Sequence, residues 1–187
     1  TLKGEDMHTI TEEEVLHEAD RCANCGCVAV NASDLAGALI ALDAEIRTNQ
    51  RRLAASELFT AAESRTTVLR RDEMIEEVWI PLPKGETRQV YLKFRIRNAI
   101  DFPIVSVAYF ARLEKGIIKS PRLVLGAVAP VPLRAVEVES LLEDQLASEE
   151  LAEQAALLAV NTANPLVGNK AKVEIVKALV RKAVSPG

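Results

Sequence analysis

The sequence is poor in aromatic and histidine side chains and has no long uninterrupted apolar run. Aromatic residues make up 4% of the 187 residues, and His8 and His17 are its two histidines. Two histidines leave little scope for acid–base catalysis, and no Ser-His-Asp set, paired-carboxylate pattern or P-loop is evident. We therefore expect no catalytic residue in this chain. No stretch approaches the ~20 apolar residues of a membrane-spanning helix, so we expect no membrane partner.

Clustered positive charge is also missing. The chain has 23 Lys and Arg residues against 27 Asp and Glu residues, which gives a formal net charge of −4. Phosphate binding needs clustered Lys and Arg, whereas Arg51-Arg52 and Arg70-Arg71 are isolated pairs typical of solvated faces. We expect no nucleic-acid partner.

Cysteine is rare, and all three cysteines lie close together, at Cys22, Cys25 and Cys27. This usage argues against a secreted disulfide framework and favours a reducing cytoplasm. The C-x2-C-x-C spacing brings three thiolates within reach of one centre, which predicts an iron–sulfur cluster or zinc. A closed site needs a fourth ligand, for which His8 and His17 are the other strong candidates. The alternative is a severed ligand loop that leaves three free thiols.

The overall composition is that of a globular protein, with 49% hydrophobic and 27% charged residues. The first residues, TLKGEDMH, contain neither an initiator methionine nor a signal peptide, so we interpret the chain as a fragment of a longer protein.

The first half of the chain mixes short helical and strand patterns. Ser33 or Asp34 predicts the N-cap of a buried helix, and Gly37 inside that helix predicts close packing against another backbone. The other expectations are a helix at 10–21, a strand at 28–30, a strand at 45–48, a helix at 53–59, a connection at 66–69, a strand ending near 80 and a linker or hairpin at 81–88.

The second half reads as strands followed by helices. Residues 90–96 alternate apolar and polar side chains, with Tyr91, Lys93 and Arg97 on the polar face. Residues 104–113 are nearly all apolar, as expected for a central strand, and a Glu-Lys-Gly turn leads to a strand at 117–128. Helical spacing follows at 136–142, 151–160 and 173–184. This order predicts an α+β fold with small antiparallel sheets packed against helices on one face.

Three blocks of sequence, spanning roughly residues 28–184, resemble the FAD-binding (medium) subunit of the molybdenum hydroxylase family, to which carbon monoxide dehydrogenase and xanthine dehydrogenase belong. The blocks are Asn31-Ala-Ser-Asp-Leu35 with the helix after it, Thr67-Val-Leu-Arg-Arg-Asp-Glu73 to Pro81, and the stretch from Val90 to Leu142 together with NPLVGNKAKVEIVKALVRKAV. The resemblance implies a helix and cysteine-rich linker at 1–27, a remnant of the FAD-binding subdomain at 28–82, and the flavoprotein C-terminal domain at 83–187.

By this resemblance, five residues would contact FAD in the intact protein: Asn31, Ser33, Asp34, Leu69 and Lys93. The Leu69 contact would be through its backbone, and Tyr91 shares the Lys93 face. Plain alternatives exist for four of them, namely helix capping for Ser33 and Asp34, core packing for Leu69 and a solvated strand face for Lys93.

The departures from the family are as informative as the matches. The family's two glycine-rich loops hold the flavin pyrophosphate through backbone N–H groups. Here the first subdomain is absent, and Cys25-Gly-Cys-Val-Ala-Val30 takes the place of the second loop. The segment Glu18 to Gly26 instead resembles iron–sulfur ligand sequences of glutamate-synthase-type NADPH oxidoreductases, which implies an upstream FAD/NAD(P)-binding domain or subunit as partner.

Three functions follow as expectations. The first is the C-terminal domain of a flavin-dependent oxidoreductase, packing over FAD and helping electrons pass between NAD(P)H or iron–sulfur centres and the flavin, but inactive as an isolated fragment. The second is a non-catalytic interaction or dimerisation module that has lost flavin binding, with the apolar helices at 151–160 and 173–184 supplying a homodimer surface. A metal carrier built on the cysteine loop is a third.

Overall fold

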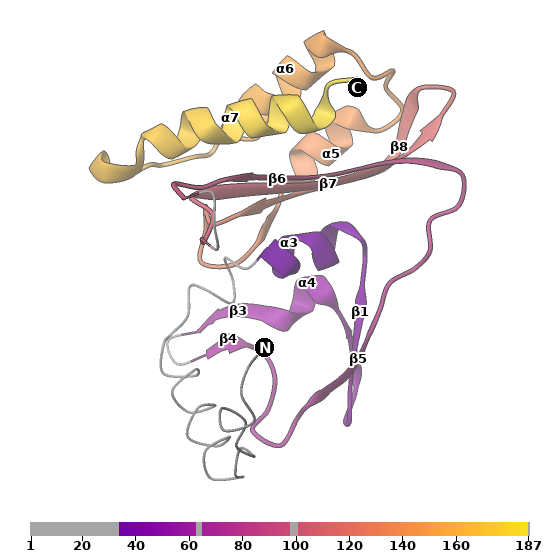
Figure 1. Ribbon diagram of the computed structural model, residues 1–187, viewed down its shortest axis with the longest axis vertical. Coiled ribbons are helices and arrows are strands. Elements are labelled where there is room, and N and C mark those ends of the chain that lie inside the picture. Colours follow the sequence, from indigo (N-terminus) through magenta and orange to yellow (C-terminus); the bar gives the residue numbers. More distant parts are fainter. Residues whose placement is uncertain (1–33, 63–64, 98–100, 187) are drawn as a thin grey trace, which may run out of the picture.

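The structure, a computed structural model, describes residues 34–62, 65–97 and 101–186. A four-stranded sheet divides the molecule (Figure 1): helices α5 to α7 lie on one face, and helix α3 with the smaller sheets lies on the other. The α+β class expected from the sequence is confirmed. The predicted helix at 10–21 and strand at 28–30 lie outside the described residues.

The large sheet is antiparallel and has the order β6-β7-β8-β9. Its strands are β6 (Glu86–Phe94), β7 (Val105–Glu114), β8 (Ile117–Gly126) and β9 (Leu133–Arg134). The near-continuous apolar sequence of β7 places it between β6 and β8, with its first seven residues buried. Lys115 and Gly116 both have positive φ angles, 55° and 82°, as a tight two-residue hairpin turn requires.

Three helices cover one face of this sheet: α5 (Val136–Leu142), α6 (Glu149–Leu158) and α7 (Ala171–Val184). The Ser148 side chain caps α6 by accepting a hydrogen bond from the Leu151 N–H. The apolar faces of the helices meet alternate residues of β7 and β8 in the larger core. Its fully buried members include Val107, Leu123, Leu125, Leu142, Ala155 and Val180.

The opposite face of the sheet is covered as well, which corrects the expectation of helices on one face. Helix α3 (Asp34–Ala41) packs there, and a Cβ at Gly37 would lie 3.8 Å from the Ala108 Cβ. The predicted close approach of Gly37 to another backbone is wrong: its neighbours are side-chain atoms of the sheet, at distances of ordinary van der Waals contact that a Cβ would tolerate. The α3 residues Leu39 and Ile40 form a second core with Phe110 and residues of the small sheets.

The small sheets are built from short elements. One sheet has the order β2-β1-β5 and the other pairs β3 with β4. The bounds are β1 (Glu45–Thr48), β2 (Arg52–Ala54), α4 (Ala55–Leu58), β3 (Phe59–Ala62), β4 (Arg65–Thr67) and β5 (Ile75–Trp79), and a 3-10 turn, η2 (Val167–Asn169), precedes α7.

Several predicted elements need correction. The helix expected at 53–59 is the four-residue α4, because Leu53 pairs with Ile46 in one sheet and Phe59 with Thr67 in the other. The connection expected at 66–69 begins as β4 for the same reason. The apolar face expected along 90–96 is buried only at its start: Phe94 is 45% and Ile96 81% exposed.

The described part of the chain contains no helix that combines the length and apolar character needed to cross a membrane.

A buried carboxylate ties α5 to the sheet. Glu139 Oε1 accepts hydrogen bonds from the Leu123 N–H (2.9 Å) and from Arg134 Nε (2.9 Å). Glu139 therefore joins α5 to β8 and β9 in one contact. Arg134, which follows the loop after β8, therefore has a structural role as the ion-pair partner of Glu139.

We predict that Glu139→Ala lowers the free energy of unfolding by about 2 kcal/mol, because the buried Leu123 N–H loses its acceptor. Urea unfolding of the 187-residue chain measures the change. Glu137→Ala, at an exposed position on the same helix, is the matched control and should change stability by less than about 0.5 kcal/mol. Equal unfolding midpoints for the two variants would contradict the assignment.

Candidate functional site

Lys93 lies on the same face of the large sheet as α3. In the strand register Lys93 pairs with Ser106 of β7, and Ser106 pairs with Gly126 of β8. These three residues form a row across the sheet. Tyr91 occupies the next position of this face, opposite Ala108, and Ala108 belongs to the core beneath α3. The placement of Tyr91 and Lys93 on one strand face, expected from alternation, is confirmed.

Gly126 makes room for the centre of this row. A Cβ at position 126 would lie 2.2 Å from the Ser106 Oγ, which is shorter than any contact a carbon atom tolerates. Ser106 itself is buried, with 3% of its surface exposed. Glycine at 126 therefore allows the hydroxyl group to occupy the space beside β8.

Helix α3 packs on this face of the sheet (Figure 1), against both β7 and β8. At its C-terminal end, Arg122 Nε donates a 2.6 Å hydrogen bond to the Ala41 carbonyl. Gly37 is one helical turn before Ala41 and lies over Ala108 and Val124. Val124 is two positions along β8 from Arg122, in the direction of Gly126. The positive end of the helix dipole is thus directed toward the end of the sheet that carries Lys93.

A shallow hollow separates α3 from β6. Its volume is about 180 Å³, and its walls include Ala38, Leu42, Tyr91, Ala108 and Phe110. Apolar side chains from both elements and the Tyr91 ring make this a surface suited to a flat, largely apolar group.

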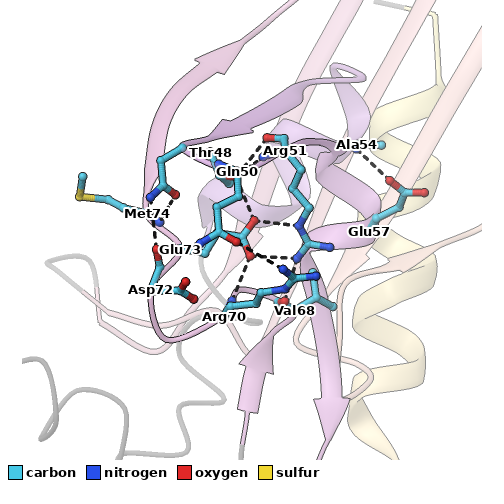
Figure 2. Close-up of polar contacts among 11 residues, drawn as sticks. Thr48, Gln50, Arg51, Ala54, Glu57, Val68, Arg70, Asp72, Glu73 and Met74 are labelled. Atoms are coloured by element: carbon cyan, nitrogen blue, oxygen red, sulfur yellow. Dashed lines mark hydrogen bonds and ion pairs between the residues drawn. The ribbon is translucent and has the colours of Figure 1, made fainter.

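The segment that carries Leu69 is anchored by a buried carboxylate (Figure 2). The Glu73 side chain is fully buried. Its Oε1 accepts a hydrogen bond from Arg51 Nε (2.8 Å), and its Oε2 accepts one from Arg51 Nη2 (3.1 Å). Thr48 Oγ1 donates to Glu73 Oε1 (2.9 Å), and the Arg70 N–H donates to Oε2 (3.0 Å). Four hydrogen bonds therefore join this acid to the β1–β2 turn and to its own chain.

These bonds lower the pKa of Glu73 to about 2, chiefly through the Arg51 guanidinium and then through the Arg70 N–H, which outweigh the opposing effect of desolvation. Glu73 is therefore ionised throughout the neutral range.

The same network holds the backbone on both sides of Leu69. The Val68 N–H donates to the Leu58 carbonyl (2.9 Å), and the Val68 carbonyl accepts from Arg51 Nη2 (2.9 Å). The Arg70 N–H is bound by Glu73, and the Arg70 carbonyl accepts from the Glu73 N–H (3.1 Å). The N–H and carbonyl of Leu69 itself have no hydrogen-bond partner among the residues that the structure describes. Its side chain packs against the α3 core.

The structure thus places Leu69 and Lys93 on the α3 side of the large sheet. For Asp34 it describes the backbone, which begins α3, but not the side chain. Asn31 and Ser33 lie outside the described residues, as do Cys22, Cys25 and Cys27, so the metal prediction stays a prediction. Within residues 34–62, 65–97 and 101–186, no group of three His, Cys, Asp or Glu side chains is arranged to hold a metal ion.

Sequence reasoning missed Glu73, Ser106 and Gly126. Glu73 lies in a charged stretch, RRDEMIEE, which is typical of a solvated face. Gly126 had a usable signal, because glycine at the end of an apolar strand indicates a close approach. Ser106 had none, since a single serine in an apolar strand is common.

Comparison with known proteins identifies the same fold. Residues 89–185 match the family described as CO dehydrogenase flavoprotein C-terminal domain. The glyceraldehyde dehydrogenase medium chain of Sulfolobus acidocaldarius is 29% identical over 160 residues, which cover 81% of this chain and 56% of that protein.

Among solved structures, carbon monoxide dehydrogenase from Hydrogenophaga pseudoflava has a TM-score of 0.70 at 22% identity, covering 80% of this chain and 57% of its own. Quinoline 2-oxidoreductase from Pseudomonas putida 86 has a TM-score of 0.71 at 20% identity, covering 85% and 57%. The chain therefore spans a little over half the length of the relatives that it matches. Since the family match extends over more than half of the 187 residues, the chain belongs to the CO dehydrogenase flavoprotein C-terminal domain family, that of the FAD-binding subunits of molybdenum hydroxylases.

Proposed function

We propose that this chain forms the ring-binding part of a flavin site in an FAD-dependent oxidoreductase of the molybdenum hydroxylase type. One observation carries the proposal. Leu69 and Lys93 both lie on the α3 side of the sheet. The N–H and carbonyl of Leu69 have no hydrogen-bond partner within the described residues. Family membership supports the same assignment.

The residues present fit one end of the cofactor. A flavin ring is flat and largely apolar on its faces, which suits the hollow between α3 and β6, and its edge carries donors and acceptors of hydrogen bonds, which suit the Leu69 peptide groups. Leu69 and Lys93 are not among the residues that line the hollow. The pyrophosphate end needs a cradle of N–H groups. Among the described residues, Gly37, Gly85, Gly116, Gly126 and Gly168 are separated from one another and make no glycine-rich loop.

When bound, FAD supplies the electron-transfer chemistry. The residues of this chain bind and orient the ring: Leu69 through its peptide groups, Lys93 through its positive charge at the ring edge, and α3 by covering one side against water. Asn31, Ser33 and Asp34 complete the proposed contacts. The partner in this proposal is an upstream FAD/NAD(P)-binding domain or subunit, and the setting is the cytoplasm.

A second candidate is an interaction module without flavin, and one observation favours it. Strand β5 is exposed along its whole length at the edge of its sheet, including the apolar residues Ile75, Val78 and Trp79. Exposed apolar side chains on an edge strand are typical of a surface that another chain covers. Metal at Cys22, Cys25 and Cys27 is a separate proposal, which metal analysis of anaerobically prepared protein tests.

We predict that the purified 187-residue chain binds no FAD, whereas a longer protein that adds an N-terminal pyrophosphate-binding half does. The absorbance bands of bound flavin, near about 370 and 450 nm, report the difference. Flavin bands that co-purify with the 187-residue chain would show that the missing cradle is not required. A colourless longer protein that also fails to take up added FAD would favour the interaction module.

We predict that Lys93→Gln in the flavin-binding protein raises the FAD dissociation constant about tenfold, because the positive charge beside the ring is lost. Fluorescence titration of the apoprotein with FAD measures the constant. Lys84→Gln, in the exposed segment before β6, is the control and should leave the constant unchanged. Equal constants for the two variants would remove Lys93 from the site.

A further inference from the structure

The backbone around Leu69 alternates between satisfied and unsatisfied groups. Val68 and Arg70 each have both their N–H and carbonyl in hydrogen bonds, while Leu69 between them has neither within the described residues. Backbone polar groups in folded proteins are normally paired with protein, water or ligand. Leu69 is half-buried, so its N–H and carbonyl, held in place by the bonded groups of Val68 and Arg70, are available to water or to a ligand.

The Arg51–Glu73 pair produces this arrangement. Arg51 Nη2 donates both to Glu73 Oε2 and to the Val68 carbonyl. The Arg51 guanidinium therefore fixes Val68, the residue before Leu69. Glu73 Oε2 accepts from the Arg70 N–H, which fixes the residue after it. The planar guanidinium presents its donors in a rigid fork, a geometry that a lysine ammonium does not reproduce.

We propose that Arg51 and Glu73 are positioning residues that hold the Leu69 N–H and carbonyl ready for the edge of a planar heterocycle bearing both a donor and an acceptor. The inference rests on the proposed function, in which that heterocycle is the flavin ring. Neither side chain touches the ring. They act by removing the conformational freedom that the 68–70 segment would otherwise lose on binding.

Thr48 is the third member of the network. Its Oγ1 accepts the Gln50 and Arg51 N–H groups, at 3.2 and 2.9 Å, and donates to Glu73. It therefore fixes the β1–β2 turn from which Arg51 extends. The charged group facing Glu73 is the Arg51 guanidinium, beside the neutral donors Arg70 N–H and Thr48 Oγ1, and the lowered pKa of Glu73 keeps this contact ionised down to acidic pH.

The test compares Glu73→Gln and Arg51→Lys in the full-length flavin-binding protein. Each is expected to raise the FAD dissociation constant about tenfold and to speed hydrogen exchange in the apoprotein of the Val68 and Arg70 amides, whose N–H groups are hydrogen-bonded on either side of Leu69. Glu77→Gln and Arg52→Lys are the matched controls, because Glu77 binds Arg47 instead and Arg52 is exposed. The controls are expected to leave both quantities at the wild-type value.

The outcomes separate this inference from the proposed function. If wild-type protein binds FAD and both variants bind it as tightly, the positioning role is wrong and the flavin site stands. A loss of thermal stability in the variants without any change in FAD affinity likewise leaves a purely structural role and overturns the inference. If wild-type protein binds no FAD, the proposed function fails, and the exchange rates of the Val68 and Arg70 amides in the variants still test whether Arg51 and Glu73 hold the 68–70 segment.

The pH dependence gives a second readout. Because the pKa of Glu73 is lowered on folding, its contribution is present above the unfolded value of 4.5 and is lost as the pH falls toward 2. The difference in stability between wild type and Glu73→Gln should therefore be constant from about pH 5 to pH 8 and shrink below about pH 4.5. A difference that instead appears only on acidification would contradict the ionised contact.

Discussion

Strand β7 is the constraint on which the rest of the structure depends. Alternate residues of this strand belong to two different cores: Val107 and Tyr109 face the three-helix layer, and Ala108 and Phe110 face α3. Because both faces are buried, the strand admits almost no polar residue, and a register slip of one position would exchange the two cores. The sheet face on which α3 lies is thereby set at the same time as the face that binds α5 to α7.

The candidate site follows from this arrangement. Helix α3 packs over Ala108 and Val124 at Gly37, and its N-terminal end is directed toward the end of the sheet that carries Lys93 and Gly126. The small sheets then bring the Leu69 segment against the same core, where the Arg51–Glu73 pair holds it. Hydrophobic packing thus forms the surface, and the ion pair between the partly exposed Arg51 and the buried Glu73 fixes the Leu69 segment against it.

Much of the fold was predictable because its patterns are long. The apolar run of β7, the Lys-Gly turn after it and the helical spacing at the C-terminus each span enough residues to decide the element. The short strands β3 and β4 were not predictable from the sequence, because they depend on pairing between residues whose local sequence also suits a helix or a loop. Lys93 and Leu69 came from family resemblance, whereas Glu73 was hidden because burial of a charged residue is set by distant partners such as Arg51 and Thr48.

We propose that the α3 side of the large sheet forms part of a flavin site, in a chain that spans 56–57% of the length of the relatives it matches. The most direct measurement is an experimental structure of the flavin-loaded full-length protein. The account predicts the ring edge within hydrogen-bond distance of the Leu69 backbone, with Lys93 beside it and α3 covering one side. A flavin bound against α5 to α7, or bound without contact to Leu69, would contradict it.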